Sequence, residues 1–134
     1  MTLGVRAIVH DETAGTVLLV RHTYVSGFQL PGGGIEPGET AEQALAREVE
    51  EEGNVTLTAR PSLVGFHYNR HASRRDHVAT YVATGFVVNG PKKPDREIAE
   101  AGFYALDSLP ADTTAATRRR LAEVFGEAEL STYW

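Results

Sequence analysis

The hydrophobic positions near the N-terminus follow the two-residue period of a β-strand. Val5, Ala7 and Val9 fall on one face of residues 5–10, and such alternation is typical of a half-buried strand. A short apolar run follows at Val17–Val20, after the turn-forming segment Asp11–Gly15. Two strands that are joined by a short polar turn favour an antiparallel pair, so we expect a β-hairpin here.

The pattern changes to that of a helix farther along the chain. Residues 40–52 are rich in Ala, Leu, Gln, Arg and Glu and contain neither Gly nor Pro, which favours an α-helix. Thr40 is a suitable N-cap, and Gly53 and Asn54 are the residue types that most readily adopt the left-handed conformation that ends a helix. The preceding segment Leu30–Gly34 contains a proline and three glycines, and we expect it to lack regular structure.

Strand-like segments dominate the rest of the chain. They are predicted at Val55–Thr58, Leu63–Tyr68, Val78–Val88 and Ala101–Leu106. A polar, basic loop from Asn69 to His77 separates two of them, and Thr113–Phe125 has apolar residues at helical spacing. No internal repeat or flexible linker divides the sequence. We therefore expect a single domain over residues 1–134, an α/β sandwich in which helices pack on a sheet.

Composition narrows the class of protein. With 134 residues, 42% of them hydrophobic and 23% charged, the chain has the composition of a globular domain and not of a disordered or fibrous one. The absence of cysteine excludes disulfides, thiol catalysis and cysteine-based metal sites. No apolar run approaches the ~18 residues of a membrane span, and Met1–His10 is interrupted by charge too early for a secretory signal. We expect a soluble, cytoplasmic protein without a membrane partner.

The charge is unevenly distributed. The net charge is −5, but residues 36–52 alone hold seven glutamates against one arginine, so the remainder of the chain is close to neutral. A protein that binds nucleic acid through the phosphate backbone usually needs a basic face, so a concentrated acidic patch argues against that partner. The acidic patch suggests that the protein binds a divalent cation instead.

Three of these glutamates are predicted to converge. On a helical wheel Glu48, Glu51 and Glu52 form one stripe, whereas Arg47 and Glu50 face elsewhere. Like charges three or four residues apart repel each other, and a bound cation would remove that repulsion. Carboxylate oxygens suit Mg²⁺ or Mn²⁺. A solvated acidic face is the alternative when the helix is considered alone.

The helix does not stand alone, because residues 33–55 resemble the Nudix box, in which a glycine and a glutamate precede an Arg-Glu-aliphatic-X-Glu-Glu-X-Gly-aliphatic segment. Its defined positions are matched by Gly33, Glu39, Arg47, Glu48, Val49, Glu51, Glu52 and Val55. Asn54 stands where the family has its last glycine, and Asn is the best substitute for Gly in a left-handed helix cap. Phe28–Gly33 and Glu100–Pro110 resemble segments that flank the box in that family.

This resemblance implies the Nudix (MutT-like) fold, an α/β/α sandwich with a mixed β-sheet flanked by helices. It also implies a pyrophosphatase whose substrate is a nucleoside diphosphate linked to another group X, and whose cofactor is Mg²⁺ or Mn²⁺. The implied metal ligands are Glu48, Glu51, Glu52 and the carbonyl of Gly33. By the same resemblance Glu48 or a nearby acid is the general base, and Arg47 and Glu39 hold the loop and the helix together.

Candidate residues outside the box are less specific. The family often takes a further base or ligand from later in the chain, and the candidates here are Glu97, Glu100 and His77, of which Glu100 ranks first. The basic loop supplies Arg70, Arg74 and Arg75, which either meet substrate phosphates or remain solvated. Candidates for stacking on a base are Tyr24, Phe28 and Tyr68, although aromatic residues in such strands more often belong to the core.

The sequence leaves the substrate open. The stretch Arg70–Ser73, about fifteen to eighteen residues after Val55, carries neither the proline of many ADP-ribose hydrolases of this family nor the tyrosine of its diadenosine polyphosphate hydrolases. A nucleoside triphosphate, including oxidised ones, is slightly favoured over a nucleotide sugar or ADP-ribose. A non-catalytic nucleotide-binding module is the alternative from another class. We expect the tail Leu130–Trp134 to dock either on its own domain or on a second copy, which leaves a homodimer open.

Overall fold

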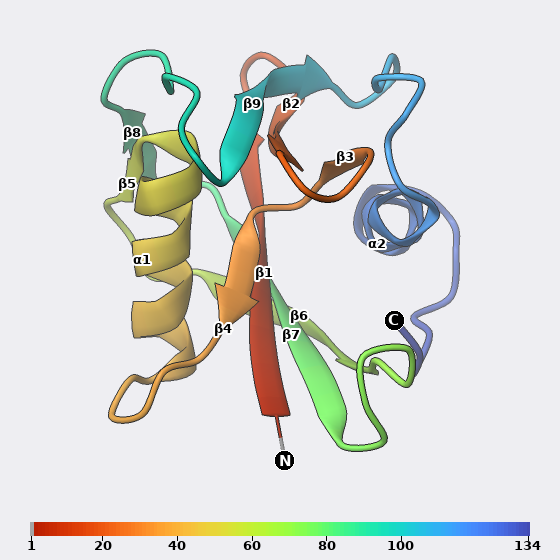
Figure 1. Cartoon of the computed structure of the whole chain (residues 1–134). Coiled ribbons are helices and arrows are strands. Elements are labelled where there is room, and N and C mark those ends of the chain that lie inside the picture. Colours follow the sequence, from red (N-terminus) through yellow and green to blue (C-terminus); the bar gives the residue numbers. More distant parts are fainter. Residues whose placement is uncertain (1) are drawn as a thin grey trace.

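The computed structural model describes residues 2–134, which form nine strands and two helices (Figure 1). The strands are β1 (Thr2–Asp11), β2 (Thr16–His22), β3 (Phe28–Gln29), β4 (Gly32–Gly34), β5 (Val55–Leu57), β6 (Ser62–Tyr68), β7 (Asp76–Ala83), β8 (Phe86–Val88) and β9 (Ile98–Ala105). The helices are α1 (Ala41–Gly53) and α2 (Ala115–Phe125). Neither helix in this described part of the chain is long and apolar enough to cross a membrane.

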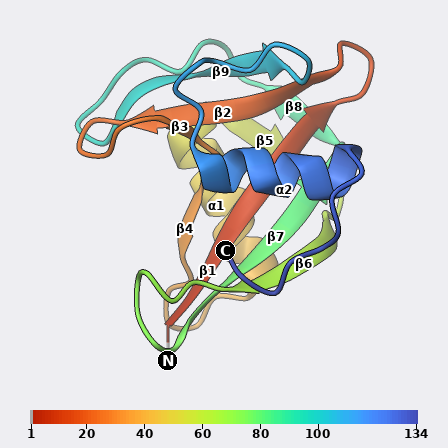
Figure 2. The ribbon, with the colours of Figure 1, turned by 90° about the vertical axis from the view of Figure 1, so that its right-hand side faces the viewer.

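A mixed sheet forms the centre of the fold. Its strand order is β3-β2-β1-β7-β6, with β4 attached to β1 and β9 attached to β2. Strands β1 and β7 run parallel, and the other pairs of this sheet are antiparallel. Helix α1 covers one face, and α2 lies across the other (Figures 1 and 2). The structure thus confirms the α/β/α sandwich with a mixed sheet flanked by helices.

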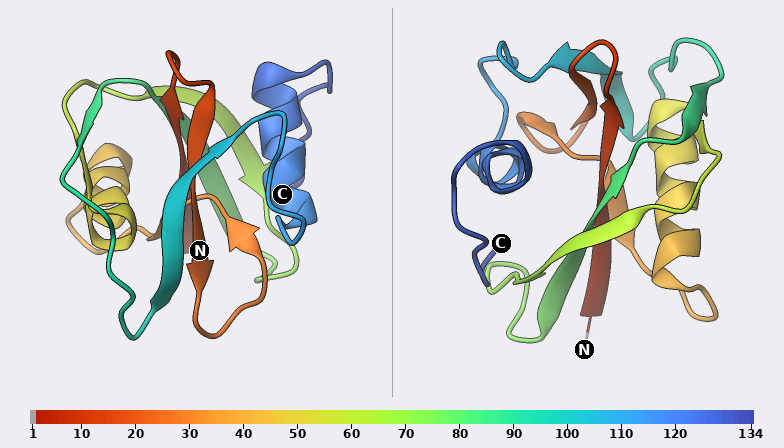
Figure 3. Two further views of the ribbon diagram at one scale, coloured as in Figure 1. Left: turned by 90° about the horizontal axis from the view of Figure 1, so that it is seen from above. Right: turned by 180° about the vertical axis from the view of Figure 1, so that it is seen from behind.

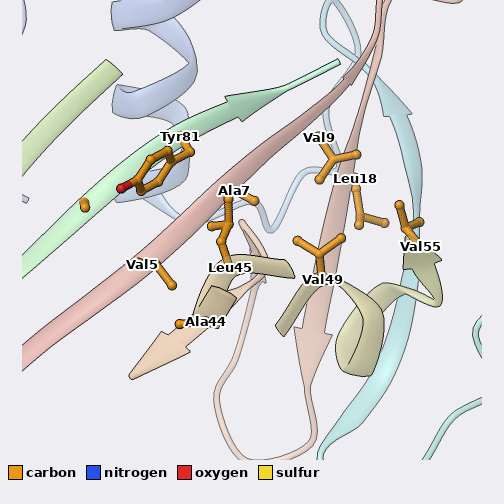
Figure 4. Close-up of a cluster of buried hydrophobic side chains, with 10 residues drawn as sticks. Val5, Ala7, Val9, Leu18, Ala44, Leu45, Val49, Val55 and Tyr81 are labelled. Atoms are coloured by element: carbon orange, nitrogen blue, oxygen red, sulfur yellow. The ribbon is translucent and has the colours of Figure 1, made fainter. Parts of the chain in front are cut away.

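Each face of the sheet has its own hydrophobic core. Val5, Ala7 and Val9 on β1 pack against α1 (Figure 4). Ile8, on the opposite face of β1, packs in a second cluster with Leu121 of α2. Odd-numbered residues of β1 therefore point toward α1 and even-numbered ones toward α2, as the two-residue period of a strand requires.

The predicted hairpin is confirmed at its turn. His10 pairs with Val17, and Asp11 pairs with Thr16. Beyond these two pairs the strands separate, so that β1 continues alongside β7 and β2 alongside β9. Pairings between distant parts of the sequence, and not the hairpin, therefore make up most of the sheet.

The strand predicted over Val78–Val88 is wrong in its second half. Strand β7 ends at Ala83, and β8 turns away to pair with β5 in a separate two-stranded sheet. Gly85 lies at the break, where an added Cβ would come within 2.5 Å of the Cβ of Ala59. The apolar run is thus divided between two sheets at a point where the backbone passes close to another segment.

Several other predicted boundaries shift by a few residues, and for two elements the cause is clear. The strand predicted at Ala101–Leu106 begins at Ile98 and ends at Ala105, because it follows the whole length of β2 as its partner. The helix predicted from Thr113 begins at Ala115, because Thr114 is its N-cap. Partner strands and side-chain caps decide both limits.

The glycine-rich segment contradicts the expectation of irregular structure. Gly32–Gly34 forms β4 and pairs antiparallel with Gly4–Arg6 of β1. A Cβ added to Gly32 would lie 1.9 Å from the carbonyl oxygen of Val5, a distance at which no side chain fits. The absence of a side chain therefore permits a strand pairing in a segment whose propensity favours a loop.

Both ends of α1 are fixed as predicted. The Thr40 hydroxyl accepts a hydrogen bond from the Gln43 N–H at 3.1 Å, and the Gln43 side chain accepts one from the Thr40 N–H at 2.9 Å, which together form a capping box. Asn54 adopts the left-handed conformation with a φ of 56°, and its N–H donates to the Glu50 carbonyl. Its side-chain amide donates to the Gly90 carbonyl at 3.2 Å. Asn54 is therefore the C-cap.

One arginine ties the loop before α1 to the helix. Arg47 forms a bidentate pair with Glu39, with distances of 2.7 Å from Nε to Oε2 and 2.9 Å from Nη2 to Oε1. It also donates to the Gly34 carbonyl, and Glu39 accepts a hydrogen bond from the Glu36 N–H. The hydrogen bonds from Arg47 and from the Glu36 backbone lower the pKa of Glu39 to about 2. These contacts fix the loop on the helix.

The C-terminal tail packs on its own chain. The Tyr68 N–H donates to the Thr132 carbonyl, and the Trp134 N–H donates to the Tyr68 carbonyl. Arg120 Nη1 donates to the Trp134 carbonyl at 2.8 Å. The tail thus lies against the end of β6 (Figure 3). Of the two arrangements left open by the sequence, docking on its own domain is the one in this structure.

We expect Asn54→Ala to reduce the free energy of unfolding by about 1–2 kcal/mol, because only Gly and Asn adopt the left-handed conformation readily. The same change removes the bond to Gly90. Asn54→Gly should lower the stability less, since it keeps the backbone conformation. Urea unfolding of the three proteins measures the difference. Equal losses in the two variants would contradict the capping role.

The Glu39–Arg47 pair predicts a pH dependence of stability. The pKa of Glu39 is about 2 in the folded protein, below its ordinary 4.5, so the pair contributes fully above about pH 4.5 and its contribution is lost as the pH falls toward 2. Glu39→Gln should be less stable than the wild type at neutral pH, and the gap should shrink as the pH falls. Urea unfolding at several pH values tests this, with Glu50→Gln as the control. A gap that stays constant with pH would contradict the prediction.

Candidate active site

The carboxylates of Glu48 and Glu52 face one cavity, which we call the carboxylate cavity. It has a volume of about 270 Å³ and lies between α1, β1, β4 and the segment that follows β2. Its lining residues are Arg6, His22, Tyr24, Val25, Gln29, Gly32, Gly33, Glu48, Glu52 and Glu97. Acidic, basic and aromatic groups from distant parts of the sequence therefore meet beside the glycine strand.

Glu52 is the more buried of the two carboxylates, with a side chain that is 7% exposed. Its Oε1 accepts a hydrogen bond from the Gly32 N–H at 2.9 Å, and its Oε2 lies 3.2 Å from His22 Nε2. These contacts join α1 to β4 and to β2. The orientation of Glu52 is thus set by a backbone group and a ring on two different strands.

Glu48 lies one helical turn earlier and is partly buried. Arg47 Nη1 donates to its Oε1 at 3.0 Å. Burial raises the pKa of Glu48, the charge of Glu52 raises it further, and the hydrogen bond from Arg47 opposes both effects. A Cβ added to Gly33 would lie 2.6 Å from Glu48 Oε1, so the glycine leaves room for this carboxylate. The two glutamates therefore repel each other across a confined space.

The structure leaves the third predicted carboxylate at the surface. The Glu51 side chain is 60% exposed, and its Oε2 lies 3.5 Å from Arg47 Nη1. It borders a neighbouring depression that also contacts Glu52 and Glu97. Arg47, which the helical wheel places on another face, reaches back toward Glu51 because its side chain is long enough to bend over the helix surface. Two of the three predicted carboxylates converge on the carboxylate cavity.

Two basic side chains of this cavity, Arg6 and His22, are not among the candidates predicted from the sequence. Arg6 Nη1 donates to the Leu30 carbonyl at 2.8 Å. Burial lowers the pKa of Arg6, and the charges of Glu52 and Glu48 oppose that effect. The sequence did contain a signal for Arg6, because a charged residue inside an otherwise apolar strand indicates a candidate functional residue. No sequence signal marks His22, because its contact with Glu52 depends on where β2 lies relative to α1.

The candidate acids from later in the chain occupy different places. Glu97 lines the carboxylate cavity, whereas Glu100 does not. Glu100 forms an ion pair with Arg21 at 2.8 Å and accepts a hydrogen bond from the Tyr104 hydroxyl. His77 lies in β7 and not in the basic loop, so the loop itself comprises residues 69–75. The geometry therefore favours Glu97 over the first-ranked Glu100.

The three aromatic residues that were candidates for stacking on a base lie in different parts of the fold. Phe28 is 5% exposed and belongs to the core beneath α2. Tyr24 is 73% exposed and lines the carboxylate cavity. Tyr68 lies at the other end of the sheet, in a cavity of about 370 Å³ beside Tyr133 of the tail. Only Tyr24 is therefore placed beside the box carboxylates.

The basic loop does not meet the acidic helix. Arg70 shares the cavity beside the tail with Tyr68, and Arg74 and Arg75 are exposed on residues 69–75. None of the three arginines lines the carboxylate cavity. Their predicted role as partners of substrate phosphates at that cavity has no geometric support.

A second cavity lies beneath α2, and we call it the α2 cavity. It has a volume of about 260 Å³ and is lined by Val64, Gly65, His67, Thr80, Arg120, Glu123, Val124 and Leu130. Among residues 2–134, the Thr80 hydroxyl and the His67 Nδ1 are buried there without a hydrogen-bond partner, and His67 Nε2 lies 3.4 Å from Glu123 Oε1. Burial and the charge of Arg120 lower the pKa of His67. Arg120 is itself paired with Glu123, at 2.7 Å and 3.1 Å. The cavity thus offers neutral polar groups.

The register of the sheet connects the two cavities. Gly32 lies opposite Arg6, Arg6 lies opposite Thr80, and Thr80 lies opposite Gly65. Cross-strand neighbours share a face of the sheet, so these four residues form a row toward α2. Three strand spacings make the row about 14 Å long. Arg6 lies on this row between the carboxylate cavity and the α2 cavity.

The carboxylate cavity has a donor set that fits a divalent cation. In the conformation described for residues 2–134, no three His, Asp or Glu side chains are arranged as metal ligands. Glu48 and Glu52 nevertheless present oxygens to one cavity, and their repulsion contributes to the raised pKa of Glu48. Mg²⁺ typically takes only one or two carboxylates and completes its shell with waters and phosphate oxygens. These two residues therefore suffice as its protein ligands.

The carbonyl of Gly33, a predicted metal ligand, faces β1. Gly33 lies opposite Val5, two residues from the hydrogen bond that the Ala7 N–H donates to the Pro31 carbonyl. Hydrogen-bonded pairs alternate in an antiparallel ladder, so the Gly33 carbonyl belongs to the strand pairing. By the same alternation the Gly32 carbonyl points away from β1. A metal role for Gly33 therefore requires its carbonyl to serve two partners.

Known proteins resemble the chain over most of its length. The sequence profile of the NUDIX domain matches residues 1–125. An ADP-ribose pyrophosphatase from Methanocaldococcus jannaschii is 33% identical over 102 residues, which cover 74% of this chain and 60% of that protein. The 8-oxo-dGDP phosphatase NUDT18 from Mus musculus is 37% identical over 97 residues, which cover 72% of this chain and 29% of that protein.

A solved structure supports the same relationship. The crystal structure of a MutT NUDIX hydrolase from Burkholderia pseudomallei superposes with a TM-score of 0.72 at 30% identity, covering 92% of this chain and 97% of that one. The two curated relatives above are longer, since the chain spans 60% and 29% of their lengths. Because the profile match, the sequence identity and the fold agree, the chain belongs to the Nudix family.

Proposed function

We propose that the protein hydrolyses a pyrophosphate bond in a nucleoside diphosphate linked to a group X, with a divalent cation at the carboxylate cavity. The observation that carries this proposal is the convergence of Glu48 and Glu52 on a cavity that Arg6 also lines. Pyrophosphate cleavage requires that negative charge on the phosphate oxygens be neutralised and that a water be deprotonated. The groups suited to both tasks lie on a helix and a strand, which hold them rigidly.

Each residue has a distinct task in this proposal. Glu48 and Glu52 would hold Mg²⁺ or Mn²⁺, which would supply charge neutralisation and a more acidic water. The Gly32 N–H and His22 orient Glu52. Arg6 donates hydrogen bonds to a phosphate, as guanidinium groups do. Glu48 accepts the proton of the attacking water, and Glu97 is the second candidate for that base.

We place the nucleoside in the α2 cavity. The Thr80 hydroxyl and the His67 Nδ1 are buried there without a partner among residues 2–134, between apolar walls that include Val64 and Val124. Neutral donors and acceptors between apolar walls suit a nucleobase. A nucleotide that extends along the row past Arg6 would bring its phosphates to the carboxylate cavity.

We propose a nucleoside triphosphate, including oxidised ones, as the first substrate class. The α2 cavity offers one set of neutral polar groups, and the charge of Arg120 is already paired with Glu123. ADP-ribose is the second candidate, because the chain is 33% identical to a protein named ADP-ribose pyrophosphatase. Nucleotide sugars remain a third substrate class for the same test. A non-catalytic nucleotide-binding module would bind one of these compounds without releasing products.

Incubation with nucleoside triphosphates, their oxidised forms, ADP-ribose and nucleotide sugars tests the proposal. Products should appear with Mg²⁺ or Mn²⁺ and not with EDTA. Glu52→Gln should reduce kcat by at least about 100-fold, because an oriented charge next to the reacting phosphate is lost. Glu50→Gln, exposed on the same helix, is the matched control and should retain wild-type activity.

Each alternative has its own outcome in this assay. If the protein hydrolyses ADP-ribose but not nucleoside triphosphates, ADP-ribose becomes the preferred substrate class. Nucleotide binding without products in the wild type would support the non-catalytic module. Equal activity of Glu52→Gln and Glu50→Gln would contradict the assignment of the carboxylate cavity as the active site.

Thr80→Val should raise KM by about 5- to 30-fold while kcat changes little, because a hydroxyl that bonds the nucleobase is removed far from the reacting phosphate. The thermal stability should not fall, since the Thr80 hydroxyl has no partner among residues 2–134. Steady-state kinetics and a thermal melt measure both effects. Thr84→Val, on the turn between β7 and β8, is the control. An unchanged KM would place the nucleoside elsewhere.

A further inference from the structure

A row of aromatic rings lies at the end of the sheet beside the basic loop. The ring of His77 stacks on Phe66 with centroids 5.1 Å apart, and Tyr68 lies 5.4 Å from His77. Tyr133 of the tail continues the row at 6.0 Å from Tyr68. Phe66 is 56% exposed and Tyr133 is 52% exposed. We call these four residues the aromatic row, and none of them lines the carboxylate cavity or the α2 cavity.

Two parts of the chain that are distant in sequence build this surface. Phe66 and Tyr68 alternate along β6 with the buried His67, so they face away from the α2 cavity. Tyr133 reaches them because the tail lies against Tyr68, at the same end of the molecule as the loop of residues 69–75 (Figures 1 and 3). The row is therefore a product of the tertiary structure.

The loop of residues 69–75 brings three arginines to this end of the sheet, and Arg70 contacts the aromatic row. The guanidinium of Arg70 lies over the Tyr133 ring, 5.0 Å from its centroid. Within the described chain of residues 2–134, neither Arg70, Arg74 nor Arg75 forms an ion pair. The carboxylate of this segment, Asp76, accepts hydrogen bonds from Thr2 and Asn69. The three positive charges therefore stay available for another anion.

The loop that carries these arginines is ordered by its own hydrogen bonds. The Asn69 N–H donates to the Asp76 carbonyl at 2.9 Å, and the Ala72 N–H donates to the Asn69 carbonyl at 3.2 Å. The Arg75 N–H donates to the Ser73 hydroxyl at 3.1 Å. A turn of this kind presents its long side chains outward without a large loss of backbone entropy on binding.

The net charge of −5 does not describe this end of the molecule. The acidic excess is concentrated at residues 36–52, so the rest of the chain is close to neutral. The acidic helix would therefore repel a nucleic acid, whereas the loop would not. At the loop, positive charge lies beside exposed rings.

We propose that the aromatic row and Arg70, Arg74 and Arg75 bind a single-stranded nucleic acid. Its bases stack on the exposed rings, and its phosphates contact the arginines. Rings beside a positively charged groove are the features by which proteins hold single strands without reading their sequence. A simple polyanion would leave the rings without a function, and a membrane surface would leave no partner for stacked polar rings. This inference goes beyond the proposed hydrolysis and does not depend on it.

Fluorescence anisotropy of labelled oligouridylate and oligothymidylate tests the proposal on the full chain, in buffer with EDTA so that no metal-dependent turnover interferes. Binding of either strand is expected, and its affinity should fall as salt rises. The two strands distinguish RNA from DNA as the source of the ligand. Unlabelled UTP and inorganic polyphosphate serve as competitors.

Two kinds of variant separate stacking from charge. Phe66→Ser should weaken binding by about 5- to 100-fold and leave the salt dependence unchanged, because a ring and no charge is lost. Tyr133→Ser, on the tail, should act in the same way if Phe66→Ser fails to fold. Arg74→Ser should weaken binding and reduce the slope of log affinity against log salt by about 0.7. Val87→Ser and Lys93→Ser, which are exposed and distant in sequence, are the matched controls.

Three results would overturn the inference. The first is the absence of binding to both strands. The second is an affinity for oligonucleotide that Phe66→Ser and Tyr133→Ser lower no more than Val87→Ser does, which would show that charge alone acts. The third is competition by UTP as strong as that by the oligonucleotide, which would indicate a mononucleotide site.

Discussion

A hydrogen bond from the Gly32 N–H to the buried carboxylate of Glu52 connects the helix of the Nudix box to the strand before it. Burying a carboxylate is unfavourable unless hydrogen bonds replace its hydration. The backbone can supply one here because Gly32 lies against β1 closer than any side chain would allow. His22 provides the second contact. Together with the apolar core under α1, this bond holds the Glu52 carboxylate, and with it one wall of the carboxylate cavity, against the sheet.

The pairing of β1 decides what the rest of the site contains. The residues of β1 that point toward α1 are apolar and form a core, whereas Arg6 points to the opposite face. Because Arg6 lies opposite both Gly32 and Thr80, the parallel and antiparallel partners of one strand join two cavities in a single row. A shift of one residue in this register would exchange the two faces and remove the row.

Negative and positive charges gather on different parts of the surface. The glutamates of α1 gather at the box, where a bound cation would relieve their repulsion. The arginines of residues 69–75 lie at another part of the fold, beside exposed rings. Each surface can therefore act without the other, and the sum of the charges predicts neither.

The sequence by itself determined the features that depend on neighbours in the chain. The α1 caps at Thr40 and Asn54, the turn after β1 and the box itself were predictable, because local hydrogen bonds and backbone preferences decide them. The tertiary structure alone decided the division of the apolar run between β7 and β8, the strand formed by Gly32–Gly34, and the contact of His22 with Glu52. These features depend on which distant segment approaches the backbone. Intrinsic propensity, which describes only the local chain, contains no information about such partners.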